Sequence, residues 1–341
     1  DVMKLDNLNR AFVKQGLRVI AQRSNKGFKI LADVSGASNN ISTYDLGFII
    51  GPRINAGGRV GQSHIGSTLL SCLDDIEANK LALELNQYNN ERKEIEAIVL
   101  EEAIDQVDLS PIDVMNYVYS DDWHQGVIGI VASRLKDRDN KPSFVLSIDG
   151  DYAKCSARSI KGIDLGNLII KAKGKNLIEQ GGGHSMAGGF RVHKDKIEDV
   201  KSLFIQEISK MAKRLDKVNI RQYNLNLPLS AINMDLYSEI HKLEPFGPGN
   251  NEPITRIYDV KIVKKDLRAQ KHILCLLTDR DGSRGAVSAI AYNAHQTPMF
   301  DYLMEEYNQN DDISIIGVIK KNDWNGREKL QVIIKDICVS P

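Results

Sequence analysis

Residues 114–157 read VMNYVYSDDWHQGVIGIVASRLKDRDNKPSFVLSIDGDYAKCSA, and this stretch decides the fold. Three apolar runs in it have the length and the β-branched or aromatic content of strands: 114–119, 143–148 and 152–157. Residues 127–135 carry an apolar helical pattern, and Asp149-Gly150 favours a hairpin turn. The alternation continues with two helical patterns and a strand, at 165–173, 197–215 and 189–192. Such alternation predicts a mixed α/β (α+β) domain.

A long helix is expected before this domain. Asp74 and Glu77 form a capping-box signal, and neither proline nor glycine follows until Pro111. A helix of about 33 residues would be about 50 Å long, which is typical of a connector between lobes. Residues 1–73 predict short helices and loops, with an irregular glycine-rich loop at 47–66.

The C-terminal third has a different character. Prolines and glycines between 243 and 253 predict a linker, and strand patterns dominate after it. The five expected strands are 257–263, 272–278, 285–291, 313–319 and 330–337. Asp281-Gly282 and Asn325-Gly326 mark hairpin turns, and residues 300–307 form a helical insert. This predicts a small barrel of the oligonucleotide-binding (OB) type, with a sandwich or a meander as alternatives.

The composition is that of a globular protein, with 42% hydrophobic and 26% charged residues among 341. Forty-five basic residues balance 45 acidic ones, which argues against a binder held by bulk positive charge. Four scattered cysteines argue against disulfides and zinc, and no apolar run could span a membrane, so we expect a cytoplasmic protein. Because the chain begins at Asp1 without a methionine or signal peptide, we expect a piece of a longer protein.

Two clusters predict phosphate binding. Five glycines between Gly181 and Gly189 leave backbone amides uncovered, which predicts an anion-binding nest beside His184. The alternative is a flexible turn with a packed histidine. Ser156, Arg158 and their neighbours offer short hydroxyl donors and a planar guanidinium fork. Together the two clusters are what a pocket for a nucleotide end needs.

Further candidates are single residues and strips. Trp123 could stack on a base and His124 could contact a phosphate, although Trp123 could equally anchor the following helix. Arg53 and Arg59 lie in a stretch, 50–62, that has no acidic residue. A basic strip consists of Lys261, Lys264, Lys265, Arg268 and Lys271, and a solvated face is its alternative interpretation. No motif supplies the carboxylates and histidines of a two-metal hydrolase.

The motifs together resemble the RecJ family of single-strand-specific exonucleases, in the DHH phosphoesterase superfamily. The resemblance covers essentially the whole chain. It rests on residues 1–5, 44–59, 123–135, 156–159, 181–184, 244–250 and 322–327. One departure is Lys4, which stands where the family usually has proline. The Asp-His-His motif and the earlier aspartate motifs of the family are also absent from this chain.

The resemblance implies the C-terminal two-thirds of such an exonuclease. The expected parts are the end of a DHH domain at 1–73, a connecting helix at 74–108, a DHHA1 domain at 109–216 and an OB domain at 217–341. The implied activity is hydrolysis of single-stranded DNA from 5′ to 3′ with Mn²⁺ or Mg²⁺, in DNA repair and recombination. Asp1 would be a metal ligand, and the other ligands would lie outside this chain.

The resemblance also assigns substrate contacts and partners. The residues that would hold DNA are Arg53, Asn55, Arg59, His124, Ser156, Arg158, Ser159, Gly182, Gly183 and His184. Among them, His184 would also take part in catalysis. The implied partners are single-stranded DNA, single-strand-binding protein, a helicase and recombination mediators, without a membrane.

Two alternatives stay open at this point. One keeps the superfamily but changes the substrate to short oligonucleotides or cyclic dinucleotides; the expected barrel argues against it, because a dinucleotide needs no long gripping surface. The other is a non-catalytic module that only binds single strands. For the chain alone, an inactive exonuclease part and a binding module predict the same behaviour.

Overall fold

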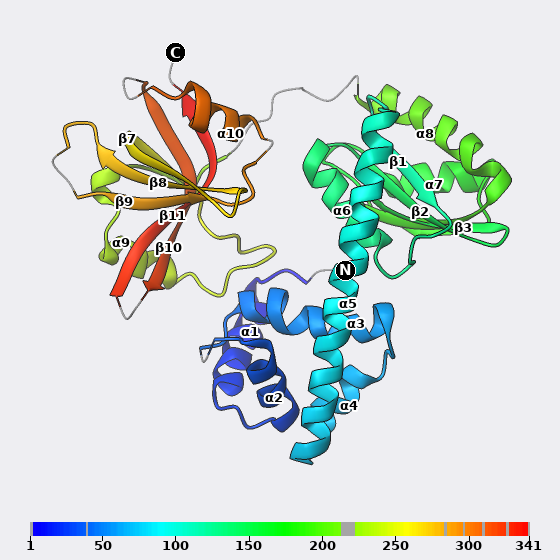
Figure 1. Ribbon diagram of the computed structural model, residues 1–341, viewed down its shortest axis with the longest axis horizontal. Helices are drawn as coiled ribbons and strands as arrows, with labels where there is room; N and C mark the ends of the chain where they lie inside the picture. The colour runs from blue at the N-terminus through cyan, green and yellow to red at the C-terminus, as the bar shows by residue number, and fades with distance from the viewer. Residues whose placement is uncertain are drawn as a thin grey trace. The chain divides into compact units, whose positions relative to one another are not determined.

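The computed structural model describes residues 3–38, 40–212, 222–282, 285–295, 297–308, 311–324 and 327–339 (Figure 1). The chain divides into two compact units. The helix–sheet unit is Val19–Val218, and the barrel unit combines Asp1–Arg18 with Asn219–Pro341. Each unit has its own hydrophobic core.

The long helix α5 (Asp75–Leu109) organises the first half of the helix–sheet unit. Asp74 caps it, because its side chain accepts hydrogen bonds from the amides of Ile76 and Glu77, as the capping-box signal predicts. Short helices gather around its first half (Figure 1). They are α2 (Lys26–Ser35), the π-helix η1 (Asp45–Ile50), α3 (Gly51–Val60) and α4 (Ile65–Ser71).

The prediction of an irregular loop at 47–66 is wrong, because η1, α3 and α4 make most of this stretch helical. Pro52 lies where η1 continues directly into α3, and its fixed φ suits the helix although its missing amide leaves one backbone bond of the stretch unmade. Ala56 and Gly57 are buried against α5, and a Cβ at Gly57 would lie 3.4 Å from the Leu85 side chain. Gly57 therefore allows close packing and does not make the backbone irregular.

The sheet of this unit has five strands, in the order β1-β2-β3-β5-β4. They are β1 (Asn116–Ser120), β2 (Ser143–Asp149), β3 (Tyr152–Arg158), β4 (Gln180–Gly183) and β5 (Ala187–His193). Only the β1–β2 pair is parallel among the described pairings, and α6 (Ile128–Asp139) connects the two strands. The Asp149-Gly150 hairpin is confirmed, with Gly150 at a φ of 61°.

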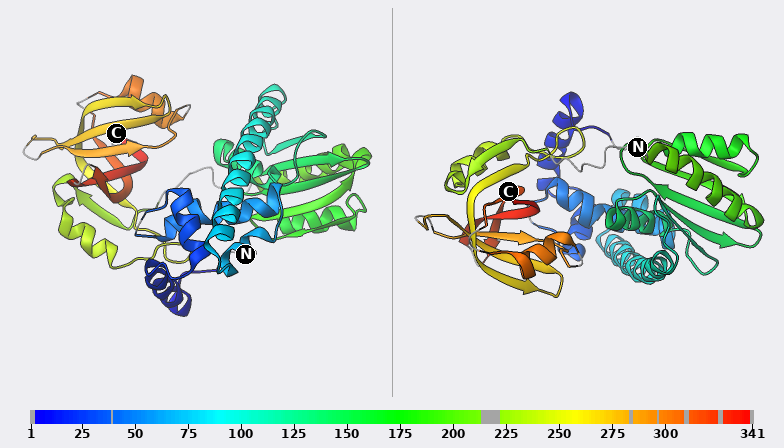
Figure 2. Two further views of the ribbon diagram at one scale, coloured as in Figure 1. Left: turned by 60° about the horizontal axis from the view of Figure 1, so that its bottom comes forward. Right: turned by 90° about the horizontal axis from the view of Figure 1, so that it is seen from above.

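Helices cover the sheet on both faces. On one face lie α7 (Leu165–Gly174) and α8 (Ile197–Ala212) (Figure 2, right). Their Leu168 and Phe204 share one core with Phe144 of β2. On the other face, α5 and α6 pack on the β1–β2 edge around Val118 and Val145. This second face is left partly open over β3, β5 and β4, as the exposed Lys154 and Gln180 show. The mixed α/β architecture expected from the sequence is confirmed.

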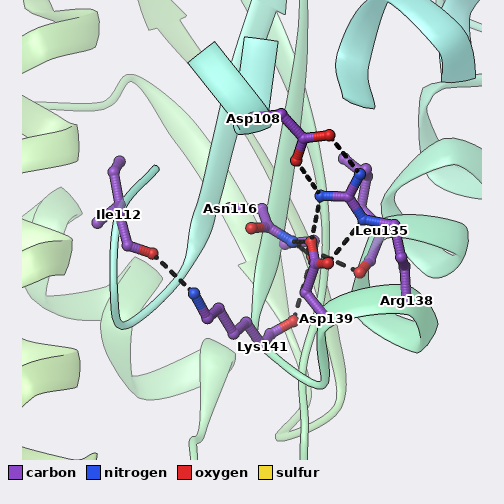
Figure 3. Close-up of polar contacts among 8 residues, drawn as sticks. Asp108, Ile112, Asn116, Leu135, Arg138, Asp139 and Lys141 are labelled. Atoms are coloured by element: carbon purple, nitrogen blue, oxygen red, sulfur yellow. Dashed lines mark hydrogen bonds and ion pairs between the residues drawn. The ribbon is translucent and has the colours of Figure 1, made fainter. Parts of the chain in front are cut away.

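A polar network joins the ends of α5 and α6 to β1 (Figure 3). Asn116, 2% exposed, donates through Nδ2 to Asp139 Oδ2 at 2.7 Å and to Ser143 Oγ at 3.1 Å. Arg138 donates to Asp108 at 2.9 Å and to Asp139 at 2.6 Å. Burial alone would lower the pKa of Arg138, but the two carboxylates outweigh it and the pKa is raised. The buried amide of Asn116 therefore has partners, as a buried polar group requires, and the exposed Arg138 extends the network to Asp108.

In the barrel unit, strands close a small barrel because β10 pairs with both β11 and β7. The sheet order is β10-β11-β9-β8-β7-β6. Its strands are β6 (Leu225–Pro228), β7 (Thr255–Arg268), β8 (His272–Asp279), β9 (Val287–Ala291), β10 (Ile313–Trp324) and β11 (Arg327–Val339). Strands β7 to β11 close the barrel, and β6 pairs only with β7. The closed five-stranded OB-type barrel is confirmed, and the sandwich and meander are wrong. The Asn325-Gly326 turn lies outside the described residues.

Short helices complete the barrel unit. They are α1 (Asn7–Ala21), which begins in this unit, η3 (Leu229–Ala231), α9 (Met234–His241), α10 (Pro298–Asp301) and η4 (Tyr302–Glu306). The last two confirm the helical insert expected at 300–307. The Arg10 guanidinium donates to the carbonyls of Leu243 and Glu244 at 2.9 and 2.8 Å, so α1 holds the start of the expected linker. Among the helices that the structure describes, none is long and apolar enough to cross a membrane.

We expect Leu85→Ala to destabilise the helix–sheet unit, because Leu85 is fully buried between α5 and α3. Loss of the side chain and the resulting cavity should cost about 2–5 kcal/mol. The matched control is Leu83→Ala, on the same helix but 54% exposed, which should cost less than about 0.5 kcal/mol. Urea unfolding followed by Trp123 fluorescence in a Trp324→Phe background measures both, and equal losses would contradict the packing.

Candidate functional site

The polar residues of β3 lie on the face of the sheet that α6 only partly covers. Val145 of β2 packs under α6, and its register partner on β3 is Ser156. Because side chains alternate along a strand, Lys154 and Arg158 share the face of Ser156. The intervening Cys155 and Ala157 point into the opposite core. Alternation thus brings two cations and a hydroxyl to one face.

Arg158 lies at the first turn of α6. A Cβ built on Gly129 would lie 3.0 Å from Ser156 Oγ and 3.4 Å from Arg158 Nη2, so a side chain there would crowd both groups. Arg158 Nη1 donates to the Ala157 carbonyl at 2.9 Å and to Ser156 Oγ at 3.4 Å, which fixes the guanidinium. A helix N-terminus and a guanidinium both favour an anion, so this corner suits a phosphate.

Arg59 brings a second guanidinium to the same corner from the end of α3. Its Nη1 donates to the Gly126 carbonyl at 2.9 Å. A Cβ on Gly126 would lie 2.3 Å from the Arg59 carbonyl, so only glycine permits this approach. Burial first, and the charge of Arg59 second, lower the pKa of Arg158. Two guanidiniums that repel each other across this corner would both be stabilised by a shared anion.

His124 is exposed at the rim of this corner. Its Nδ1 accepts a hydrogen bond from the Gly126 amide at 3.0 Å. In the neutral imidazole the proton is therefore on Nε2, which can donate to a phosphate oxygen. Trp123 is different, because it is 3% exposed and its Nε1 donates to Glu102 at 2.7 Å. The base-stacking interpretation of Trp123 is wrong, and it anchors the start of α6 instead.

The glycine run forms a β-hairpin rather than an anion-binding nest. Residues Gln180–Gly183 are strand β4, paired with β5, and the glycines of the run have no positive φ. A nest needs residues of alternating handedness, so that interpretation is wrong. The glycines avoid clashes: a Cβ on Gly183 would lie 2.5 Å from the Gly188 Cα, and one on Gly188 would lie 2.5 Å from Ile169. The exposed His184 begins the hairpin turn, and its amide donates to the Ala187 carbonyl.

The remaining sequence candidates take different places. Arg53 is held within its own unit, because its Nε donates to Asn86 at 2.9 Å and its Nη1 to the Ile49 carbonyl at 2.7 Å. Asn55 is exposed on α3, whereas Gly182 is exposed with open space around it. Ser159 is 1% exposed and donates to the Ile163 carbonyl at 2.7 Å. Its hydroxyl therefore holds the loop after β3 in shape.

The described residues do not form a metal site. Asp1 lies outside them. Within the described ranges, no three His, Cys, Asp or Glu residues are grouped so that they could hold a metal ion. The donor set that Mn²⁺ or Mg²⁺ prefers is thus not assembled among these residues.

The basic strip on β7 is partly neutralised. Lys264 and Arg268 lie 3.3 and 3.5 Å from Asp266, and Lys265 donates to the Leu303 carbonyl. The sequence motifs did not reveal Lys154 as a candidate. It lies two and four residues before Ser156 and Arg158 on one strand, and this spacing could have placed it on their face. The motifs also did not reveal Arg191, whose position depends on the pairing of β3 with β5.

Comparisons with known proteins agree with this architecture. The DHHA1 domain model matches residues 113–210 and the RecJ OB domain model matches residues 223–336. The single-stranded-DNA-specific exonuclease RecJ of Bacillus subtilis is 30% identical over 346 residues, covering 100% of this chain and 43% of the relative. RecJ of Haemophilus influenzae is 32% identical over 350 residues, covering 98% and 59%.

A solved structure agrees as well. RecJ of Thermus thermophilus in complex with Mn²⁺ superposes with a TM-score of 0.83 at 26% identity, covering 100% of this chain and 48% of that one. A second structure of the same protein contains Mg²⁺. The chain spans about half the length of the curated relatives that it matches. With a DHHA1 domain, a RecJ OB domain and this likeness over its whole length, the chain belongs to the RecJ family.

Proposed function

We propose that this chain holds single-stranded DNA in a RecJ-type exonuclease that degrades DNA from 5′ to 3′. The observation that carries the proposal is that Arg59 is bonded to the Gly126 carbonyl while Arg158 lies beside Gly129, three residues later in the chain. Two guanidiniums beside a helix N-terminus form a site for a phosphodiester, and both reach the ligand from fixed positions. The relatives are named as single-stranded-DNA-specific exonucleases, which supports single-stranded DNA as the substrate class.

The exposure and hydrogen bonds of the other site residues suggest a role for each. We propose that Arg158, Ser156 and His124 contact phosphate oxygens and that Asn55 lies along the DNA path. His184, exposed at its hairpin turn, would contact the phosphate at the scissile bond and act in catalysis. Gly182, with open space above it, would let the strand approach the backbone, and Gly183 beside it would contact the strand through its backbone. Arg53 would link α3 to α5 and η1, and Ser159 would hold the loop after β3.

The barrel unit supports a long strand as substrate rather than a dinucleotide. OB barrels bind extended single strands along their surface, and a dinucleotide needs no such surface. We further propose the domain limits 1–73, 74–108, 109–216 and 217–341 and a cytoplasmic role in DNA repair and recombination. Single-strand-binding protein, a helicase and recombination mediators are proposed as protein partners through the same family likeness.

We propose that the exonuclease uses Mn²⁺ or Mg²⁺ and that most of the metal ligands lie outside this chain. The Thermus relative is crystallised with Mn²⁺ and with Mg²⁺. The described residues of this chain hold no metal-ligand cluster, and Asp1 is proposed as its one ligand. When bound, such ions polarise the phosphodiester and activate water. This chain's part is then to bind and orient the strand.

Arg158→Gln should weaken binding of single-stranded DNA to this chain roughly 5- to 100-fold, because a charge-assisted phosphate contact is lost. The slope of log affinity against log salt should fall by about 1. Lys136→Gln is the control, since it removes one charge from the opposite end of the same helix. Fluorescence anisotropy with a labelled oligonucleotide across a salt series measures both. Equal effects of the two variants would refute a specific phosphate site.

This chain alone should bind single-stranded DNA without cleaving it in the presence of Mn²⁺. The reason is that the described residues assemble no metal site. Denaturing gels of an end-labelled oligonucleotide provide the measurement, with Asp1→Ala as the paired variant. Mn²⁺-dependent turnover that persists in Asp1→Ala would show a metal site elsewhere in the chain and overturn this division of roles.

A further inference from the structure

A groove extends from the phosphate corner along the open face of the sheet. Two adjoining cavities of about 550 and 530 Å³ share Gln125, Asp149 and Lys154 in their walls. The first cavity contains Arg59 and His124, which are proposed phosphate contacts. The second continues over β3, β5 and β4. Its walls include Tyr152, Gly189 and Arg191.

Arg191 forms a flat platform in the second cavity. Its guanidinium carbon lies 3.8 Å from the centre of the Tyr152 ring, so one face of the planar group rests on the ring. Glu179 approaches Arg191 Nη1 at 3.6 Å and accepts a hydrogen bond from the Tyr152 hydroxyl, which raises the pKa of that tyrosine. The Arg191 side chain is still 47% exposed. It is thus both positioned and accessible.

The floor beside this platform is backbone. Gly189 pairs with Ser156 on one side and with Gly182 on the other, so the middle row of the sheet carries only one small side chain. A Cβ on Gly182 would meet no atom within 4 Å, which shows open space above it. A planar ligand can therefore lie close to the strands next to Arg191.

We propose that Arg191 stacks on a nucleobase of the bound strand, and this inference rests on the proposed function. Guanidinium planes stack on bases, which are exposed in single strands. Asp149 and Glu179 lie beside Arg191 and would repel a second phosphate, so a base fits this part of the groove better. The exposed Lys154, between the two cavities, would contact the phosphate that joins the subsites.

The test compares a tetrathymidylate with an abasic tetramer of the same backbone, using the full chain. Trp123 borders the first cavity, so its fluorescence in a Trp324→Phe background reports binding in this groove. Arg191→Lys keeps the positive charge but removes the planar guanidinium. It should reduce the preference for the thymidylate over the abasic chain at least about fivefold and leave abasic binding within about twofold. Arg134→Lys makes the same exchange at a 61% exposed arginine of α6 that lines neither cavity, and it is the control with the wild-type preference.

Arg158→Gln separates this inference from the proposed function, because it should weaken both ligands equally. If Arg158→Gln weakens neither ligand, the phosphate site fails. If Arg191→Lys keeps the wild-type preference, or weakens both ligands alike, the base-stacking role is overturned while the phosphate site stands. Thermal unfolding of each variant checks that the helix–sheet unit is intact.

Discussion

The close approach of two backbones, at Arg59 on α3 and Gly126 before α6, is the constraint on which the site depends. No side chain fits at residue 126, where a Cβ would lie 2.3 Å from the Arg59 carbonyl. Gly129, one turn later, leaves room for Ser156 and Arg158 in the same way. Without these two glycines, guanidiniums about one hundred residues apart in sequence could not share one corner. Glycine here creates the site by its small size, not by its backbone freedom.

Much of the fold could be predicted because its signals are local. Strand alternation, the Asp149-Gly150 turn and the Asp74 cap each depend on a few neighbouring residues. The glycine-rich stretches could not be interpreted in this way, because their conformation depends on tertiary packing. Gly57 packs against Leu85 in a helix, and Gly183 packs against Gly188 in a hairpin. Both patterns predict irregular backbone when only the sequence is considered.

The candidate site shows the same limit. Arg158, Ser156 and His124 could be predicted as site residues from their motifs, but their meeting with Arg59 depends on how α3 packs near α6. Trp123 and Ser159 lie in the same motifs yet are buried and bonded to Glu102 and Ile163. A motif identifies a region of the site, whereas burial and hydrogen bonding separate ligand contacts from supports.

The central claim is that Arg59 and Arg158 act on one bound anion, and a double-mutant cycle tests it most directly. Single-stranded DNA affinity is measured for Arg59→Gln, Arg158→Gln and the double variant. A phosphate held by both arginines loses its position when either one is removed, so each single variant also weakens the contact of the arginine that remains. The account predicts that the double variant loses less than the sum of the single losses, by at least about 0.5 kcal/mol. Additive losses would place the two arginines at separate sites and contradict it.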